Sequence, residues 1–101
     1  MLDRILRRMR RKVRAREYVV TLHADEEMDE DGIGVLELEC CILTGEIVGR
    51  QRDRDTKEWK YLVCGESADG EAVVVVAKLS PTGKLVILTV YQAKEDETRG
   101  L

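Results

Sequence analysis

The chain has 101 residues, of which 44% are hydrophobic and 37% are charged, and its formal net charge is -3. A chain of this length folds as one domain and buries only about 60–65% of the surface that its unfolded form exposes. With no Phe, one Trp and three Tyr, the core must be aliphatic. The longest uninterrupted apolar run, residues 72–77, is much too short to span a membrane.

The charge is distributed unevenly along the chain. Residues 1–16 carry a charge of +7, whereas residues 17–101 carry -10. Because the basic segment lacks the apolar stretch of a secretory signal, we expect a cytoplasmic protein that is not bound to a membrane. The basic side chains allow two interpretations: they contact nucleic acid, or they dock on an acidic surface of the same domain or of a partner.

The first half of the chain is predicted to be mainly helical. Residues 1–16 have apolar residues at the spacing of a helix, with arginines on the remaining faces. Residues 17–22 have the alternation of a short strand. Two short helices follow, over residues 23–31 and 34–44, since Gly32 and Gly45 can terminate them.

After Gly45 the hydrophobic period becomes that of strands. We predict four strands connected in a meander, over residues 46–52, 58–65, 72–79 and 85–91. The last two flank Ser80-Pro81-Thr82-Gly83, in which proline and glycine favour a turn. Because these two strands are apolar at nearly every position, we expect both of their faces to be at least partly covered.

These elements predict an α+β fold with two layers, in which N-terminal helices pack on one face of an antiparallel sheet of four to five strands. We divide the chain into a basic helix (1–16), an α+β domain (17–93) and a polar tail (94–101). The three cysteines lack the spacing of a zinc site, so we expect reduced thiols and neither a metal nor another cofactor. They are Cys40, Cys41 and Cys64.

Four segments carry a resemblance to a known family. They are Tyr18-x-x-Thr21-x-His23-Ala24-x-x-x-Met28, Ile42-Leu43-Thr44-Gly45-Glu46-Ile47, Trp59-Lys60-Tyr61-Leu62-x-x-Gly65 and the stretch from Gly83 to Tyr91. In this order they resemble the bacterial family known as domain of unknown function 4258, over residues 2–91. That family is similar to the RelE/ParE and BrnT superfamily of small α+β toxins from toxin–antitoxin pairs. The resemblance implies a RelE-like fold and a small zinc-finger antitoxin, similar to MqsA, as the partner.

RelE-like toxins resemble metal-independent ribonucleases, which use the 2′-hydroxyl of the RNA as the nucleophile. Such a protein must supply a base, an acid and positive charge near the reacting phosphate. His23 is the only histidine, and Tyr91 and Lys78 are the other candidate catalytic residues. If the first and last strands are neighbours, His23 and Tyr91 converge.

Each of the three candidates also has a structural interpretation. His23 would then hold a helix start to the sheet by a hydrogen bond to the backbone or to Thr89. Tyr91 would bury its ring while its hydroxyl bonds a backbone carbonyl. Lys78 would extend its ammonium group to water.

Three functions remain open. The first is a toxin-like component of a toxin–antitoxin pair, acting as an endoribonuclease on RNA. The second is a non-enzymatic interaction module, a degenerate toxin, which the acidic body favours. The third is a nucleic-acid-binding protein that acts through the basic helix, which the clustered arginines favour. The candidate nucleic-acid contacts are Arg7, Arg8, Arg11, Arg14, Arg50 and Lys60.

Overall fold

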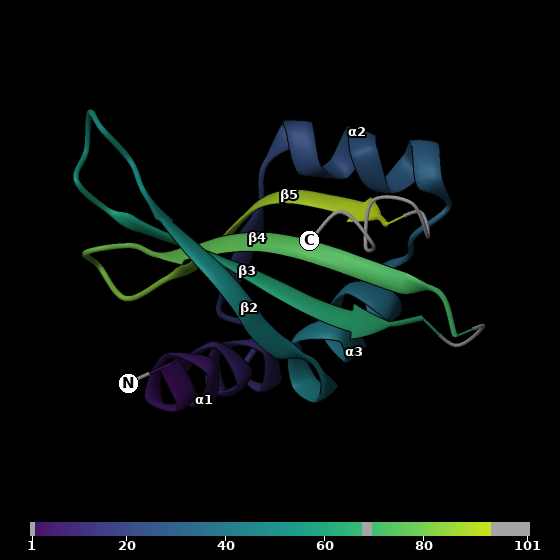
Figure 1. Ribbon diagram of the computed structural model, residues 1–101, viewed down its shortest axis with the longest axis horizontal. Helices are drawn as coiled ribbons and strands as arrows, with labels where there is room; N and C mark the ends of the chain where they lie inside the picture. The colour runs from purple at the N-terminus through teal and green to yellow at the C-terminus, as the bar shows by residue number, and fades with distance from the viewer. Residues whose placement is uncertain (1, 68–69, 94–101) are drawn as a thin grey trace.

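The computed structural model describes residues 2–67 and 70–93, which form three helices and one five-stranded sheet (Figure 1). The helices are α1 (Leu2–Arg14), α2 (Leu22–Asp31) and α3 (Val35–Thr44). The strands are β1 (Tyr18–Val20), β2 (Glu46–Arg52), β3 (Trp59–Glu66), β4 (Ala72–Leu79) and β5 (Leu85–Gln92). The predicted α+β fold is confirmed, and the predicted tail over 94–101 lies outside the described residues. None of the described helices has the length and apolar character needed to cross a membrane.

The sheet has the strand order β1-β5-β4-β3-β2. Strands β2 to β5 form the predicted antiparallel meander. Strand β1 instead pairs parallel with β5, with Tyr18 opposite Leu85 and Val20 opposite Ile87. The sheet is therefore mixed rather than entirely antiparallel. A parallel pair needs a long connection, and the two helices and three strands between β1 and β5 provide it.

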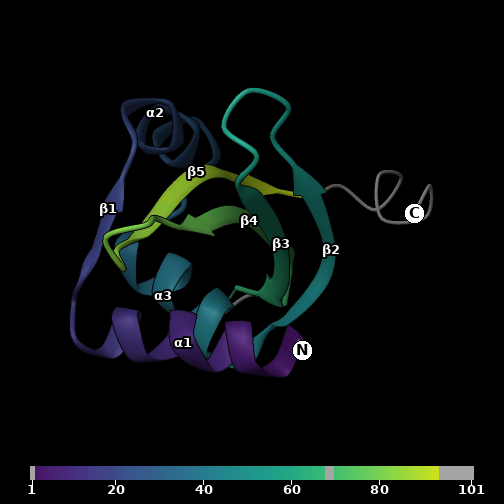
Figure 2. The ribbon, with the colours of Figure 1, turned by 90° about the vertical axis from the view of Figure 1, so that its left-hand side faces the viewer.

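Helices α1 and α3 pack on one face of the sheet, as Figure 2 shows. Their apolar side chains and those of the strands form a single core. Its members include Leu6, Met9, Val13, Leu38, Cys41, Ile42, Val63, Val75, Leu85 and Ile87. On the opposite face of β3 and β4 the described residues place no helix, yet Val74 is buried there and Leu62 and Val76 are half-buried. For β4, the expectation that both faces are at least partly covered is therefore confirmed, because Val73 and Val75 are buried on one face and Val74 on the other.

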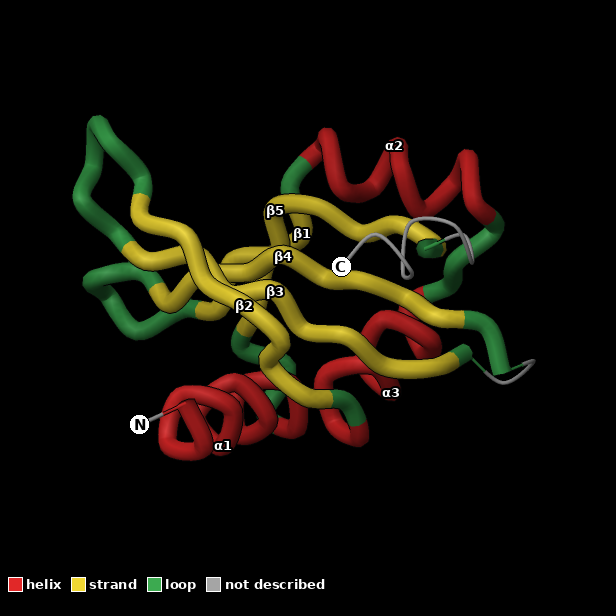
Figure 3. Tube along the Cα trace, viewed as in Figure 1, coloured by secondary structure: helices red, strands yellow, loops and turns green. Residues whose placement is uncertain are grey.

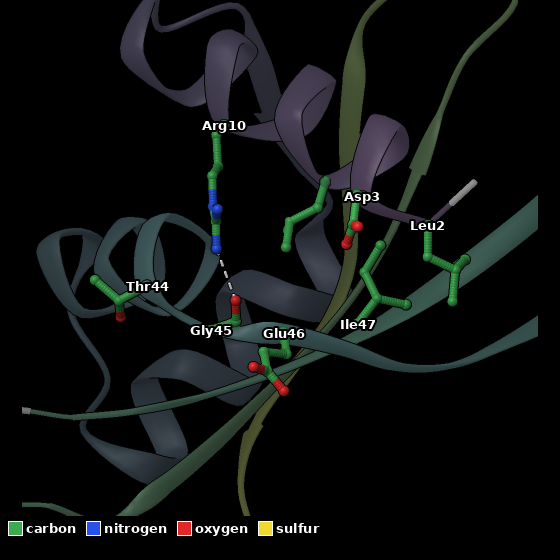
Figure 4. A pocket seen from close by; sticks show the side chains of 8 residues that line it. Leu2, Asp3, Arg10, Thr44, Gly45, Glu46 and Ile47 are labelled. Carbon is green, nitrogen blue, oxygen red and sulfur yellow. Dashed lines mark hydrogen bonds between the residues drawn. The ribbon is translucent and has the colours of Figure 1, made fainter.

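Helix α1 is an integral part of this domain. Its Arg10 donates hydrogen bonds to the backbone oxygens of Ile42 (3.0 Å) and Gly45 (2.8 Å), as Figure 4 shows for Gly45. The last carbonyls of a helix have no partner within it and attract a cation, so Arg10 stabilises the end of α3. Of the two interpretations of the basic segment, docking holds for Arg10. The segment 1–16 and the following residues therefore share one core.

Helix α2 lies along the part of β5 that β1 leaves unpaired. Oε1 of Glu27 accepts a hydrogen bond from the backbone N–H of Val90 (3.3 Å), and Oδ2 of Asp31 accepts one from that of Gln92 (2.9 Å). An exposed strand edge with free N–H groups invites pairing with other chains. Two acidic side chains of α2 thus accept the hydrogen bonds of two N–H groups at this edge.

The three cysteines are free thiols, as predicted. Cys40 is exposed, whereas Cys41 is fully buried between α3 and the sheet, where its thiol donates to the backbone oxygen of Val73 at 3.4 Å. Burial raises the pKa of Cys41 to about 12. Cys41 therefore belongs to the core and is not a nucleophile at neutral pH.

Candidate nucleic-acid interface

The candidate catalytic residue His23 lies on the surface, in the first turn of α2. Its side chain is 69% exposed, and its Nε2 atom is 3.2 Å from Oε1 of Glu27. Within the described residues no hydrogen bond joins His23 to the backbone or to Thr89. The structural interpretation of His23, in which it bonds the backbone or Thr89, is therefore wrong.

Thr21 performs the structural role that we considered for His23. Its hydroxyl accepts a hydrogen bond from the N–H of Ala24 (3.2 Å), which caps α2, and donates one to the carbonyl of Leu88 on β5 (3.3 Å). A capping threonine typically contributes about 1 kcal/mol to stability. Thr21 therefore fixes the start of α2 to the sheet, two residues before His23.

Tyr91 and Lys78 point to the same face of the sheet but lie far apart along it. Tyr91 is opposite Val74 on β4, and Lys78 is four residues further along that strand. At about 3.3 Å per residue, this separates the two backbone positions by roughly 13 Å. Nζ of Lys78 is instead 3.4 Å from Oε2 of Glu58. The structure does not bring the three candidate catalytic residues together.

The candidate arginines of α1 are exposed, because the opposite side of the helix is in the core. At 3.6 residues per turn, Arg11 lies in the middle of the exposed face, and the other three divide between its two flanks. Arg7 and Arg14 lie on the flank of Arg10, towards α3. Arg8 lies on the other flank and lines a pocket beside Trp59 and Pro81. Of these arginines, Arg8 is therefore the one that lines the pocket at the start of β3 and the end of β4.

Trp59 lies at the start of β3 and is 37% exposed. The guanidinium carbon of Arg50 is 4.3 Å from the centre of its ring, and that of Arg52 is 5.6 Å away. Both arginines project from β2 beside Trp59, because Arg52 is directly opposite Trp59 in the hairpin and Arg50 is two residues away on the same face. Contacts of this length are cation–π interactions.

The hairpin between β2 and β3 and the turn between β4 and β5 extend from the same end of the molecule (Figure 3). Between this end and α1 lies a pocket of about 210 Å³. It is lined by Ile5, Arg8, Glu58, Trp59, Tyr61, Leu79 and Pro81. We call the exposed group Arg8, Arg50, Arg52 and Trp59 the Arg–Trp surface.

Lys60 is separated from this surface. It follows Trp59 in β3, so its side chain points to the opposite face of the sheet. Its Nζ atom is 3.7 Å from Oδ2 of Asp53. The backbone N–H groups of Thr56 and Asp55 donate to Asp53 and lower the pKa of that carboxyl, with a smaller effect from Lys60. Lys60 therefore stabilises the hairpin loop.

Several motif residues that carried the family resemblance have structural roles. The hydroxyl of Tyr18 donates to the carboxylate of Glu39 and joins β1 to α3, and burial, followed by this hydrogen bond, raises the pKa of Tyr18 to about 12. A Cβ atom at Gly45, which ends α3, would overlap the backbone oxygens of Cys41 and Cys64, and one at Gly65 on β3 would crowd the backbone of Cys41. Trp59 is the motif residue that is exposed beside cationic groups.

The comparisons with known proteins identify a family for most of the chain. The family described as "Domain of unknown function (DUF4258)" matches residues 20–92, which include β2 to β5 and the capping Thr21. No curated protein and no solved structure matches the chain. Since the family match spans more than two thirds of its length, the chain belongs to the DUF4258 family.

Proposed function

We propose that this protein is a toxin-like component of a bacterial toxin–antitoxin pair that binds RNA through the Arg–Trp surface. The observation that supports RNA binding is the stacking of Arg50 and Arg52 on the exposed Trp59 beside Arg8. The toxin-like assignment rests on the resemblance of the family to RelE-like toxins. That resemblance also gives the proposed partner, a small zinc-finger antitoxin. A cytoplasmic location is part of the same proposal.

Arginines around an aromatic ring suit single-stranded nucleic acid. The guanidinium groups bind phosphates, and the ring offers a flat surface on which any base can stack. The acidic helix α2 does not oppose this binding, because it lies along β5 whereas Arg50 and Arg52 lie on β2, at the other edge of the sheet. The overall negative charge is thus compatible with a cationic surface at one end of the molecule.

The proposal is for binding and does not assign cleavage to His23, Tyr91 and Lys78. General acid–base catalysis needs groups within hydrogen-bond reach of the same substrate atoms. Lys78 is engaged by Glu58, and its backbone lies roughly 13 Å along the sheet from that of Tyr91. An effect on growth would then follow from occupying RNA, without a hydrolytic step at these residues.

The binding proposal predicts different effects for two arginines of the same helix. Arg8→Ala should weaken the binding of a short single-stranded RNA by about three- to tenfold, because a phosphate contact is lost. Arg50→Ala should have a similar effect. Arg14→Ala is the matched control, with the same change of charge on the other flank of α1, and should change affinity less than about twofold. Fluorescence anisotropy with a labelled RNA measures all four proteins.

The same variants connect binding to the toxin-like role. Inducible expression of the native protein should slow bacterial growth, and Arg8→Ala with Arg50→Ala together should relieve it while Arg14→Ala does not. Equal losses of affinity in Arg8→Ala and Arg14→Ala would show that only net charge matters, and would contradict the assigned surface.

A further inference from the structure

We infer that the pocket beside Trp59 takes one unpaired base of a single-stranded RNA, an inference that rests on the proposed RNA binding and specifies its substrate class. The pocket lies between the middle of α1 and the ends of β3 and β4. It is therefore adjacent to the cationic groups of the Arg–Trp surface and continuous with Trp59.

The size and lining of the pocket fit a flat, uncharged ring. Its volume is about 210 Å³, below the roughly 300–1,000 Å³ of pockets that enclose whole drug-sized ligands. Ile5, Leu79 and Pro81 give it apolar walls. Glu58 also lines it, but its carboxylate is paired with Lys78. The apolar walls disfavour the burial of a charged phosphate group. A base fits this environment better than the RNA backbone does.

Trp59 connects this pocket to the arginines. Arg50 and Arg52 project from β2, on one side of β3, whereas Leu79 and Pro81 come from the end of β4, on its other side. Trp59 itself lies between them at the start of β3. An RNA strand that crosses this end of the protein can place a phosphate on the arginines and its neighbouring base against Trp59.

The geometry also selects single-stranded over double-stranded RNA. A paired base has its edges hydrogen-bonded and its faces stacked, so it cannot enter a pocket between side chains unless it leaves the helix. Aromatic stacking on an unpaired base contributes about 5- to 150-fold in affinity. The arginines alone bind either form, since both carry phosphates.

The single tryptophan of the chain provides a direct measurement. A short single-stranded RNA should quench the fluorescence of Trp59 as it binds. An RNA of the same length and sugar–phosphate backbone that lacks its bases should bind about 5- to 150-fold more weakly and leave the emission nearly unchanged. A duplex of the same length should also bind without quenching.

A pair of variants separates the base from the backbone. Trp59→Leu retains the arginines but removes the ring, so its affinity for normal and base-free RNA, measured with labelled RNA, should become nearly equal. Arg14→Ala should retain the native difference. Equal binding and quenching by normal and base-free RNA would overturn the base pocket while leaving the proposed RNA binding intact. Absence of binding to every RNA would overturn both.

Discussion

Replacing Gly45 with alanine should lower the free energy of unfolding by about 3 kcal/mol, a large effect for the addition of one methyl group. A Cβ atom at this position would overlap the backbone oxygens of Cys41 and Cys64. Both oxygens belong to backbone, so neither can turn away as a flexible side chain would. The substitution therefore has to separate the end of α3 from β3. Urea unfolding followed by circular dichroism measures the change.

Gly49→Ala is the matched control for this substitution. Gly49 lies on β2, four residues beyond Gly45, and a Cβ atom there would have no neighbour within 4 Å. We expect a change within about 0.5 kcal/mol, as is usual for surface positions. If both substitutions destabilised the protein equally, the close approach of α3 to the sheet would not be the cause.

Met9→Ala should destabilise the protein by about 2–5 kcal/mol, because it leaves a cavity where a fully buried side chain had been. Met9 is 0% exposed and lies in the middle of α1. This result would show that the basic helix is part of the core. Arg14→Ala, on the exposed face of the same helix, should change stability by about 0.5 kcal/mol or less.

A helix that served only as an arm for nucleic acid would respond differently. Met9→Ala would then leave thermal and urea unfolding unchanged while α1 remained free to contact RNA. That outcome would contradict both the shared core and the bonds from Arg10 to the end of α3.

Local patterns predicted the elements of the fold well, because periodicity and turn residues act over short distances. The Pro81–Gly83 turn and the glycines after α2 and α3 fixed most boundaries. The pairing of β1 with β5 could not be predicted with its direction, because it joins Tyr18 to Leu85 across most of the chain.

The candidate site was predicted in part, for a related reason. Arg8 and Arg50 were named from charge, but only the packing of α1 and the register of the hairpin place them near Trp59. Arg52 is not among the residues predicted from charge. Its position directly opposite Trp59 could have been predicted from the hairpin. His23 was a candidate because it is the only histidine of the chain, whereas its exposure depends on the tertiary structure.

The dependence of RNA affinity on salt tests the central claim most directly. Between about 50 and 200 mM salt, the logarithm of the association constant should fall linearly, with a slope of about -2 if three arginines each neutralise a phosphate of a single strand. Arg8→Ala and Arg50→Ala should each reduce the slope by about 0.7, and Arg14→Ala should leave it unchanged. An affinity for single-stranded RNA that is independent of salt, or a slope that Arg8→Ala and Arg50→Ala leave unchanged, would contradict RNA binding through the Arg–Trp surface.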